Sequence, residues 1–187
     1  NPVLLDKVVT ASGLPTAYSF EIVKTVQRSV KLKAKHIALQ MPEGLLMFAT
    51  VLADVLKRLT PNLTQVSVLG DVTYGACCVD DITAKELGCE LLVHYGHSCL
   101  VPLQHTAVPV LYVFVEVHID IVHMVECLKA TLQHQRPHIY LLGTVQFRHA
   151  FVIAQEMLQE SGFDVSIPQV KPLSPGEVLG CTSPVLG

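Results

Sequence analysis

Apolar residues recur every three or four positions in several stretches of this chain, and this spacing predicts amphipathic helices. The first stretch is residues 20–30, whose apolar positions are Ile22, Val23, Val26 and Val30. The second covers residues 45–59 and is opened by Pro42 and Glu43, in the way that helices often begin. Helices are also predicted at residues 80–87, 120–134 and 147–160.

Short apolar runs lie between the predicted helices and lack a clean alternation of apolar and polar positions. They are residues 37–39, 66–69, 91–93, 110–117, 139–142 and 165–167. Runs of this kind are typical of parallel strands that helices cover on both faces. The order of helices and strands therefore predicts an α/β fold with parallel sheets and flanking helices.

The predicted elements occur twice along the chain. The equivalent pairs are Ile37 and Ile139, Val66 and Val165, and Cys77 and Cys181, at offsets of 102, 99 and 104 positions. A nearly constant offset predicts a duplicated unit, so we expect repeated, pseudo-symmetric α/β domains.

The repeat sets the expected domain limits. Residues 1–104 form the first domain, which carries Cys77, and residues 105–187 form the second, which carries Cys181. The helix and strand expected after Cys78 have no counterpart after Cys181. The second domain is therefore expected to be incomplete, and the chain to be a fragment of a longer polypeptide, because a parallel unit without its last strand exposes a sheet edge.

Composition narrows the class of protein. The chain has 187 residues, 50% of them hydrophobic, and a formal charge of −3 at neutral pH. A globular core is expected, and the charge gives no basic surface for direct nucleic-acid binding. No apolar run reaches the roughly 18–20 residues needed to span a membrane, and the first ten residues lack the features of a signal peptide. These observations predict a cytoplasmic protein that does not contact a membrane.

Cysteine is the residue type with the clearest chemical meaning here. The six cysteines are Cys77, Cys78, Cys89, Cys99, Cys127 and Cys181. In a chain rich enough in apolar residues to fold unaided they do not indicate a disulfide framework, and Cys89, Cys99 and Cys127 are interpreted as packing thiols. Equivalent loops of pseudo-symmetric domains can meet at one axis, so the two offset cysteines fit a metal or cluster shared between domains.

Four segments carry a family resemblance. They are residues 40–45 (QMPEGL), 74–81 (YGACCVDD), 94–100 (HYGHSCL) and 171–182 (KPLSPGEVLGCT). In this order they resemble the diphthamide-synthesis radical enzymes, and the resemblance extends over the whole chain. It implies three similar α/β domains around one 4Fe-4S cluster, of which this sequence holds two.

The resemblance implies the roles of the cysteines. Cys77 matches the cluster ligand of the first domain and Cys181 that of the second, whereas Cys78 is interpreted as a non-ligand. The ligand of the third domain would lie beyond Gly187. This chain alone is therefore not expected to hold the cluster in its three-cysteine form or to turn over.

The resemblance also implies an activity and partners. The family transfers the 3-amino-3-carboxypropyl group of S-adenosylmethionine to the imidazole C2 of a histidine in translation elongation factor 2, the first step of diphthamide synthesis. The fourth iron position stays open for S-adenosylmethionine. The implied partners are a homologous second subunit in a heterodimer, elongation factor 2 as protein substrate, and an external electron donor.

Polar residues after the strand ends are candidates for cofactor binding. They are Glu43, Gly44, His97 and Ser98. Three of them have an ordinary alternative role: a carboxylate favoured by the helix dipole for Glu43, close packing for Gly44, and ordering of the loop for His97. Asp80 and Asp81 begin a helix, so capping comes before chemistry for both. We assign no catalytic side chain.

Other classes of function stay open at this point. The chain could be a non-catalytic, cluster-supporting partner subunit, or an iron-sulfur enzyme similar to quinolinate synthase, which also places three cysteines around one open iron. An iron-free binding module is the plainest alternative. The segments around Cys77 and Cys181 favour the radical transferase.

Overall fold

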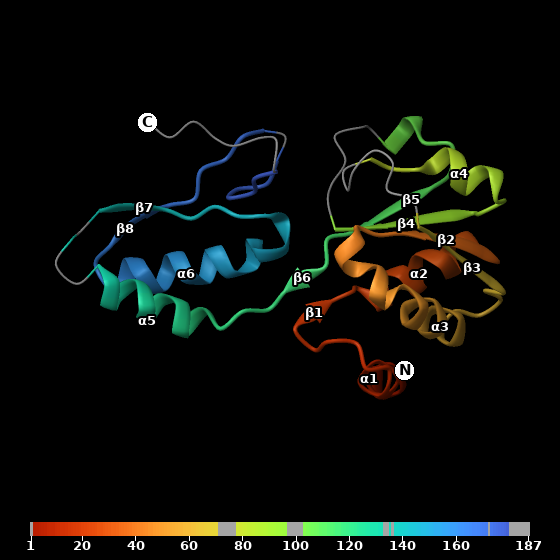
Figure 1. Ribbon diagram of the computed structural model, residues 1–187, viewed down its shortest axis with the longest axis horizontal. Helices are drawn as coiled ribbons and strands as arrows, with labels where there is room; N and C mark the ends of the chain where they lie inside the picture. The colour runs from red at the N-terminus through yellow and green to blue at the C-terminus, as the bar shows by residue number, and fades with distance from the viewer. Residues whose placement is uncertain are drawn as a thin grey trace. The chain divides into compact units, whose positions relative to one another are not determined.

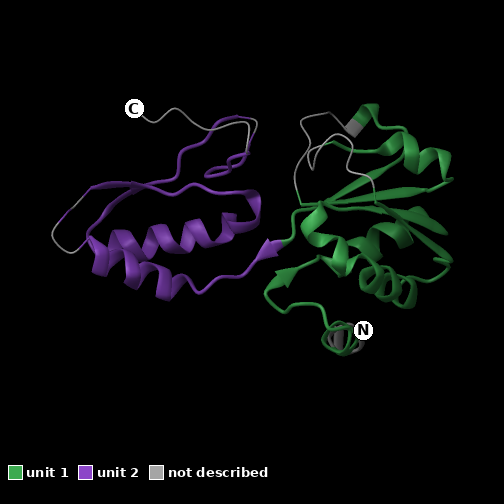
Figure 2. Ribbon diagram, in the orientation of Figure 1, with its two compact units in different colours: residues 1–115 green, residues 116–187 purple. Residues whose placement is uncertain are grey.

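The computed structural model describes residues 2–70, 78–96, 103–132, 135, 137–171 and 173–179 (Figure 1). The chain divides into two compact units, Asn1–Val115 and Glu116–Gly187 (Figure 2). Each unit has its own core and is described by itself. Among the described residues, no helix is long and apolar enough to cross a membrane.

The elements of each unit follow one another in an α/β order. The first unit contains α1 (Pro2–Ala11), β1 (Tyr18–Ser19), α2 (Ile22–Leu32), β2 (His36–Gln40), η1 (Glu43–Phe48), α3 (Ala49–Leu59), β3 (Gln65–Leu69), α4 (Asp81–Glu86), β4 (Leu91–Tyr95), η2 (Leu103–His105) and β5 (Val110–Val113). The second contains β6 (Glu116–Val117), α5 (Ile121–Thr131), β7 (His138–Tyr140), η3 (Val145–Phe147), α6 (Arg148–Glu160) and β8 (Asp164–Ser166). The η elements are 3₁₀ helices.

A parallel sheet with the strand order β3-β2-β4-β5 forms the centre of the first unit. Successive side chains of a strand point to opposite faces. Ile37 and Leu39 of β2 accordingly pack with α2 and α3, whereas Ala38 lies in a second cluster with Ala84 of α4. Figure 1 shows α2 and α3 on one face of the sheet and α4 on the other. The predicted α/β fold with a parallel sheet and flanking helices is confirmed.

Strand position decides how far each strand is buried. All five residues of β4, at the centre of the sheet, are buried, as the apolar run 91–93 predicts. β3 lies at the edge, and its Gln65 and Val68 are exposed. The expectation that helices cover every strand on both faces is wrong for β3, because α3 packs against β3 while α4 packs against β4.

The face that α2 buries agrees only in part with the one its apolar residues indicate. Val23 and Val30 are 45% and 47% exposed, whereas Thr25 and Ser29 are fully buried. The Ser29 hydroxyl donates to the Thr25 main-chain oxygen at 2.8 Å, so a polar group is satisfied inside the helix. Small side chains on this face let α2 pack closely on the sheet. The helix was predicted correctly, and Ile22 and Val26 face the core as expected, but Val23 and Val30 do not.

The second unit repeats the combination of parallel strands and packed helices seen in the first. β7 and β8 form a parallel pair, and α5 and α6 pack against it on one side (Figure 1). The register pairs Ile139 with Val165, as it pairs Ile37 with Val66 in the first unit. These are the residues that the sequence repeat aligns, so the prediction of repeated parallel units is confirmed.

The boundary between the compact units lies at Val115 and Glu116, later than the domain limit predicted after residue 104. The reason is that β5 pairs in parallel with β4 and so belongs to the first sheet. The apolar run 110–117 is not one strand, because Val115 has a φ of 53°, which β-branched residues rarely adopt. The limits of the two repeats themselves stay a prediction.

Tyr95, at the end of β4, makes the stability of the first unit sensitive to alkaline pH. Its side chain is fully buried beside Phe20. Burial raises the pKa of Tyr95 well above its usual value of about 10, and the nearby Thr25 hydroxyl opposes this only in part. Within the described residues, neither hydroxyl has a hydrogen-bond partner of good geometry. The folded chain holds the phenolic proton more tightly than the unfolded chain does, so stability falls as the pH rises above about 10.

We expect Tyr95→Phe to remove this loss of stability. At neutral pH the free energy of unfolding should change by less than about 1 kcal/mol, because the variant loses no hydrogen bond of good geometry. Above about pH 10 the original protein should lose stability faster than the variant. Urea unfolding followed by circular dichroism, from neutral pH to about pH 11, measures both curves. Curves that stay parallel over that range would contradict the raised pKa.

Candidate functional site

Two polar side chains lie buried where β2 and β4 end at one edge of the first sheet. The register pairs Gln40, the last residue of β2, with His94 of β4. Gln40 is 4% exposed and His94 is 1% exposed. Ligands of parallel α/β sheets bind outside this edge, so the residues that shape it are candidates for function.

The Gln40 amide binds two main-chain atoms and one imidazole. Its Nε2 donates to the oxygen of Cys78 at 2.8 Å, and its Oε1 accepts from the N–H of Asp80 at 3.1 Å. The Nδ1 of His94 lies 3.0 Å from the same Oε1. A main-chain N–H only donates and a main-chain oxygen only accepts, so these two contacts fix the orientation of the amide. Because Oε1 is then the acceptor, His94 carries a proton on Nδ1.

This network attaches the start of α4 to the sheet. The Asp80 carboxylate accepts from the Thr83 N–H at 3.1 Å, which confirms the predicted capping role of Asp80. The Asp81 carboxylate accepts from the main-chain N–H of Ala107 and so ties α4 to the segment before β5. Cys78 is the first described residue after 71–77. Gln40 therefore holds the main chain directly after the predicted ligand.

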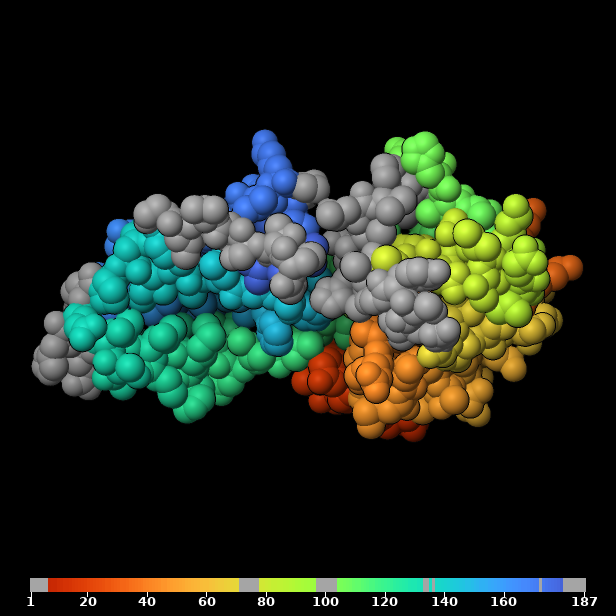
Figure 3. All heavy atoms as spheres, turned by 45° about the horizontal axis from the view of Figure 1, so that its top comes forward, coloured from red at the N-terminus to blue at the C-terminus, as the bar shows by residue number. Residues whose placement is uncertain are grey.

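A close approach between two loops shapes the same edge. Gly96, after β4, has a φ of 106°, and a Cβ there would lie 3.1 Å from Cγ of Pro42. Pro42 leads into η1, so glycine at 96 allows the two loops to meet. Figure 3 shows the η1 segment, in orange, at the surface of the unit.

The predicted cofactor residues Glu43 and Gly44 are exposed at the start of η1. No described atom lies within 4 Å of the position that a Cβ on Gly44 would take. Close packing against the described residues is therefore not the reason for glycine at this position. η1 also corrects the predicted helix 45–59, whose first turns are 3₁₀ before α3 begins.

In the second unit, a main-chain pairing holds the segment that leads to Cys181. The Gly143 N–H donates to the Gly176 oxygen at 2.9 Å, and the Val178 N–H donates to the Gly143 oxygen at 2.9 Å. A Cβ on Gly143 would lie 2.6 Å from the ring of Phe151, and one on Gly176 would lie 2.8 Å from the same ring. A side chain at either position would therefore displace the Phe151 ring or the paired main chain.

Four of the predicted site residues, Cys77, Cys181, His97 and Ser98, lie outside the described residues. Cys99 lies outside them too. Their roles, and the meeting of Cys77 and Cys181 at one cluster, stay predictions.

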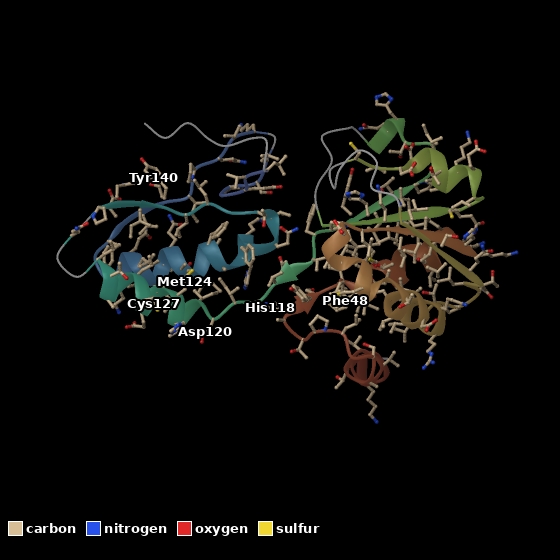
Figure 4. The ribbon with its side chains drawn as sticks, viewed as in Figure 1. Phe48, His118, Asp120, Met124, Cys127 and Tyr140 are labelled. Atoms are coloured by element: carbon tan, nitrogen blue, oxygen red, sulfur yellow. The ribbon has the colours of Figure 1, made fainter. Side chains whose placement is uncertain are left out.

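The other cysteines have different surroundings. Cys89 is buried with its Sγ 3.4 Å from Nε2 of His36, and burial raises the pKa of its thiol, so its packing role is confirmed. Cys127 is exposed on α5, with its Sγ 3.6 Å from Nε2 of His123 (Figure 4). The packing interpretation of Cys127 is wrong, because α5 buries Val125 and turns Cys127 to its outer side.

Comparison with known proteins shows the family. The family described as "Putative diphthamide synthesis protein" matches residues 41–187. The chain belongs to the diphthamide synthesis family.

Curated relatives agree with this assignment. Subunit 1 of 2-(3-amino-3-carboxypropyl)histidine synthase from Caenorhabditis elegans is 51% identical over 176 residues, which cover 92% of this chain and 43% of that protein. The human protein of the same name is 51% identical over 175 residues, which cover 92% of this chain and 39% of that protein. The chain thus spans about two fifths of the length of these relatives.

Two solved structures of one protein have a similar fold. The crystal structure of Dph2 from Pyrococcus horikoshii matches with a TM-score of 0.73 and 32% identity, over 88% of this chain and 48% of that one. A second crystal structure of that protein, equally similar, contains a 4Fe-4S cluster.

Sequence reasoning missed the roles of Gln40 and His94 in this diphthamide synthesis chain. Both lie in segments that carry the family resemblance, but neither was singled out. The available signal was polarity, since an amide and an imidazole end two apolar runs that become buried strands.

We expect Gly176→Ala to destabilise the second unit by about 2–4 kcal/mol, from a left-handed backbone and overpacking against Phe151. Gly88→Ala is the matched control, because Gly88 has a φ of 73° against 75° for Gly176 but no described atom within 4 Å of the added Cβ. It should cost only about 1–2 kcal/mol from the backbone. Urea unfolding measures both losses. Equal losses would show that packing against Phe151 does not require glycine at 176.

Proposed function

We propose that this chain carries two cysteine ligands of a 4Fe-4S cluster in a transferase. The enzyme would move the 3-amino-3-carboxypropyl group of S-adenosylmethionine to the imidazole C2 of a histidine in translation elongation factor 2. The observation that carries the proposal is about 50% identity over nine tenths of the chain with proteins named 2-(3-amino-3-carboxypropyl)histidine synthase subunit 1. The cluster in the similar Dph2 structure supports the cofactor.

The described residues fit such a cofactor. Cysteine thiolates are the usual ligands of iron–sulfur clusters, and the proposed ligands are Cys77 and Cys181. Gln40 and Gly176 hold the main chain close in sequence to these two cysteines, and no described atom fills the space beside Gly44 at η1. When bound, the cluster supplies the electron that cleaves a carbon–sulfur bond of S-adenosylmethionine.

The proposed S-adenosylmethionine residues are Glu43, Gly44, His97 and Ser98. The Glu43 carboxylate is exposed at the same sheet edge as Gln40, so it can accept hydrogen bonds from the ammonium or a ribose hydroxyl of this ligand. Gly44 would let the ligand approach the main chain of η1.

One of the proposed partners follows from the names of the relatives, and the others follow from the family resemblance. A protein named subunit 1 supports a homologous second subunit in a heterodimer. Elongation factor 2 is the proposed protein substrate, and an external electron donor would reduce the cluster.

The ligand assignment is tested in the whole polypeptide that carries this sequence, produced with its partner subunit and reconstituted without oxygen. Cys77→Ala and Cys181→Ala should each lower cluster-bound iron at least about tenfold, because a thiolate ligand is lost. Iron analysis and visible absorption measure the cluster. Cys78→Ala is the matched control and should keep it.

Two outcomes would count against the proposal. An original protein that takes up no cluster would refute the proposed function. A Cys78→Ala variant that loses as much iron as Cys77→Ala would refute the assignment of the ligand.

We expect Glu43→Gln to weaken S-adenosylmethionine binding about tenfold while the cluster stays intact, because a hydrogen bond to a charged group is lost. Isothermal titration of the reconstituted protein measures the dissociation constant. Glu86→Gln on α4, also an exposed carboxylate, is the control and should bind as the original does. Equal binding by all three proteins would exclude Glu43 from the ligand site.

A further inference from the structure

We propose that Gln40 is a positioning residue for the iron–sulfur centre. Its buried amide fixes the main chain next to Cys77 and so sets where the thiolate meets the iron. This inference rests on the proposed function, since it assumes that Cys77 is a cluster ligand.

The two main-chain contacts restrain this segment in complementary ways. Nε2 holds the Cys78 oxygen and Oε1 holds the Asp80 N–H, so one planar amide grips the chain at two points two residues apart. A single contact would leave the segment free to pivot about it. Two contacts from one rigid group restrain both its place and its direction. Cys78 is bonded directly to Cys77, so the restraint acts one residue from the proposed ligand.

The amide itself is held from the sheet. His94 lies across from Gln40 in the strand register and donates its Nδ1 proton to Oε1. The Tyr112 ring meets the His94 ring edge-on, with centroids 5.5 Å apart and an interplanar angle of 81°. Rotation of the amide would place its NH₂ group against the Asp80 N–H, two donors facing each other. His94 of β4 thus fixes the orientation of the Gln40 amide, and the amide in turn fixes the main chain at residues 78–80.

A purely structural role makes a different prediction from a positioning role. If the network only supports the fold, its loss lowers the stability of the apoprotein and leaves the cluster as firmly bound in the folded fraction as before. If it positions the ligand, the cluster is lost faster from protein that is still folded. Supporting contacts around metal ligands typically change metal affinity about 10- to 100-fold.

The experiment uses the whole polypeptide with its partner subunit, reconstituted without oxygen. Gln40→Leu removes all three contacts, and Gln40→Glu keeps the shape and the acceptor but turns an oxygen toward the Cys78 carbonyl. The matched control is Gln155→Leu, because the Nε2 of Gln155 donates to one main-chain oxygen, that of Val165, at 3.1 Å. The readouts are the rate of iron loss to a chelator, the electron paramagnetic resonance spectrum of the reduced cluster, and the thermal unfolding of the apoprotein.

We expect both Gln40 variants to release iron at least about tenfold faster than the original, with an altered resonance spectrum, at a temperature where the apoprotein is folded. Gln155→Leu should match the original in both. If Gln40→Leu does not fold, Gln40→Glu decides the question. Original rates and spectra in a folded Gln40 variant would overturn the positioning role and leave the proposed function intact. An original protein that binds no cluster would overturn the proposed function and this inference with it.

Discussion

The amide of Gln40 is the contact on which the carboxyl edge of the first sheet depends. It joins the ends of β2 and β4 to the start of α4, and both polar atoms of this buried amide are hydrogen-bonded. Leaving a buried donor or acceptor unpaired costs about 1–3 kcal/mol, so a fully paired network favours one arrangement over its neighbours. The strand register contributes to this, because it places Gln40 opposite His94. The capped start of α4 and the main chain after residue 77 take their positions from that pair.

The second unit reaches a similar result with different chemistry. There the segment before Cys181 is held by main-chain hydrogen bonds between Gly143 and residues 176–178, over the ring of Phe151. The Glu177 carboxylate is buried and accepts from the Ser174 N–H at 3.0 Å, which closes the turn. One unit therefore uses a side-chain amide and the other uses closely approaching backbones. A repeated fold does not require repeated contacts.

Much of the fold could be predicted from periodicity, because buried strands and amphipathic helices leave strong patterns. The equivalence of Ile37 with Ile139, and of Val66 with Val165, followed from the offsets, and the structure adds that Ile37 pairs with Val66 as Ile139 pairs with Val165. The spacing of apolar residues failed where packing against neighbouring elements determines burial. Thr25 and Ser29 are buried because their small size suits close packing of α2, and a count of apolar residues cannot show this. The place of β5 in the first sheet depends on pairing with β4, a contact distant in sequence.

The site could be predicted only in outline. The cysteine-bearing segments were found through their resemblance to a family, and the cap at Asp80 through a local rule. Gln40 and His94 come together only when two strands 54 residues apart align in register. Neither residue has a neighbour in sequence that reveals this pairing, so no local pattern could have identified the contact.

The hydrogen bonds of Gln40 tolerate substitution at some of the bonded positions and not at others. It recognises the carbonyl of residue 78 and the N–H of residue 80, and every residue type supplies these atoms except proline at 80. The residue at position 78 can therefore be substituted without loss of its hydrogen bond to Gln40. At position 40 few replacements offer a donor and an acceptor at the same reach, and asparagine is one methylene too short. A substitution at position 78 is thus compatible with an unchanged main chain at residues 78–80.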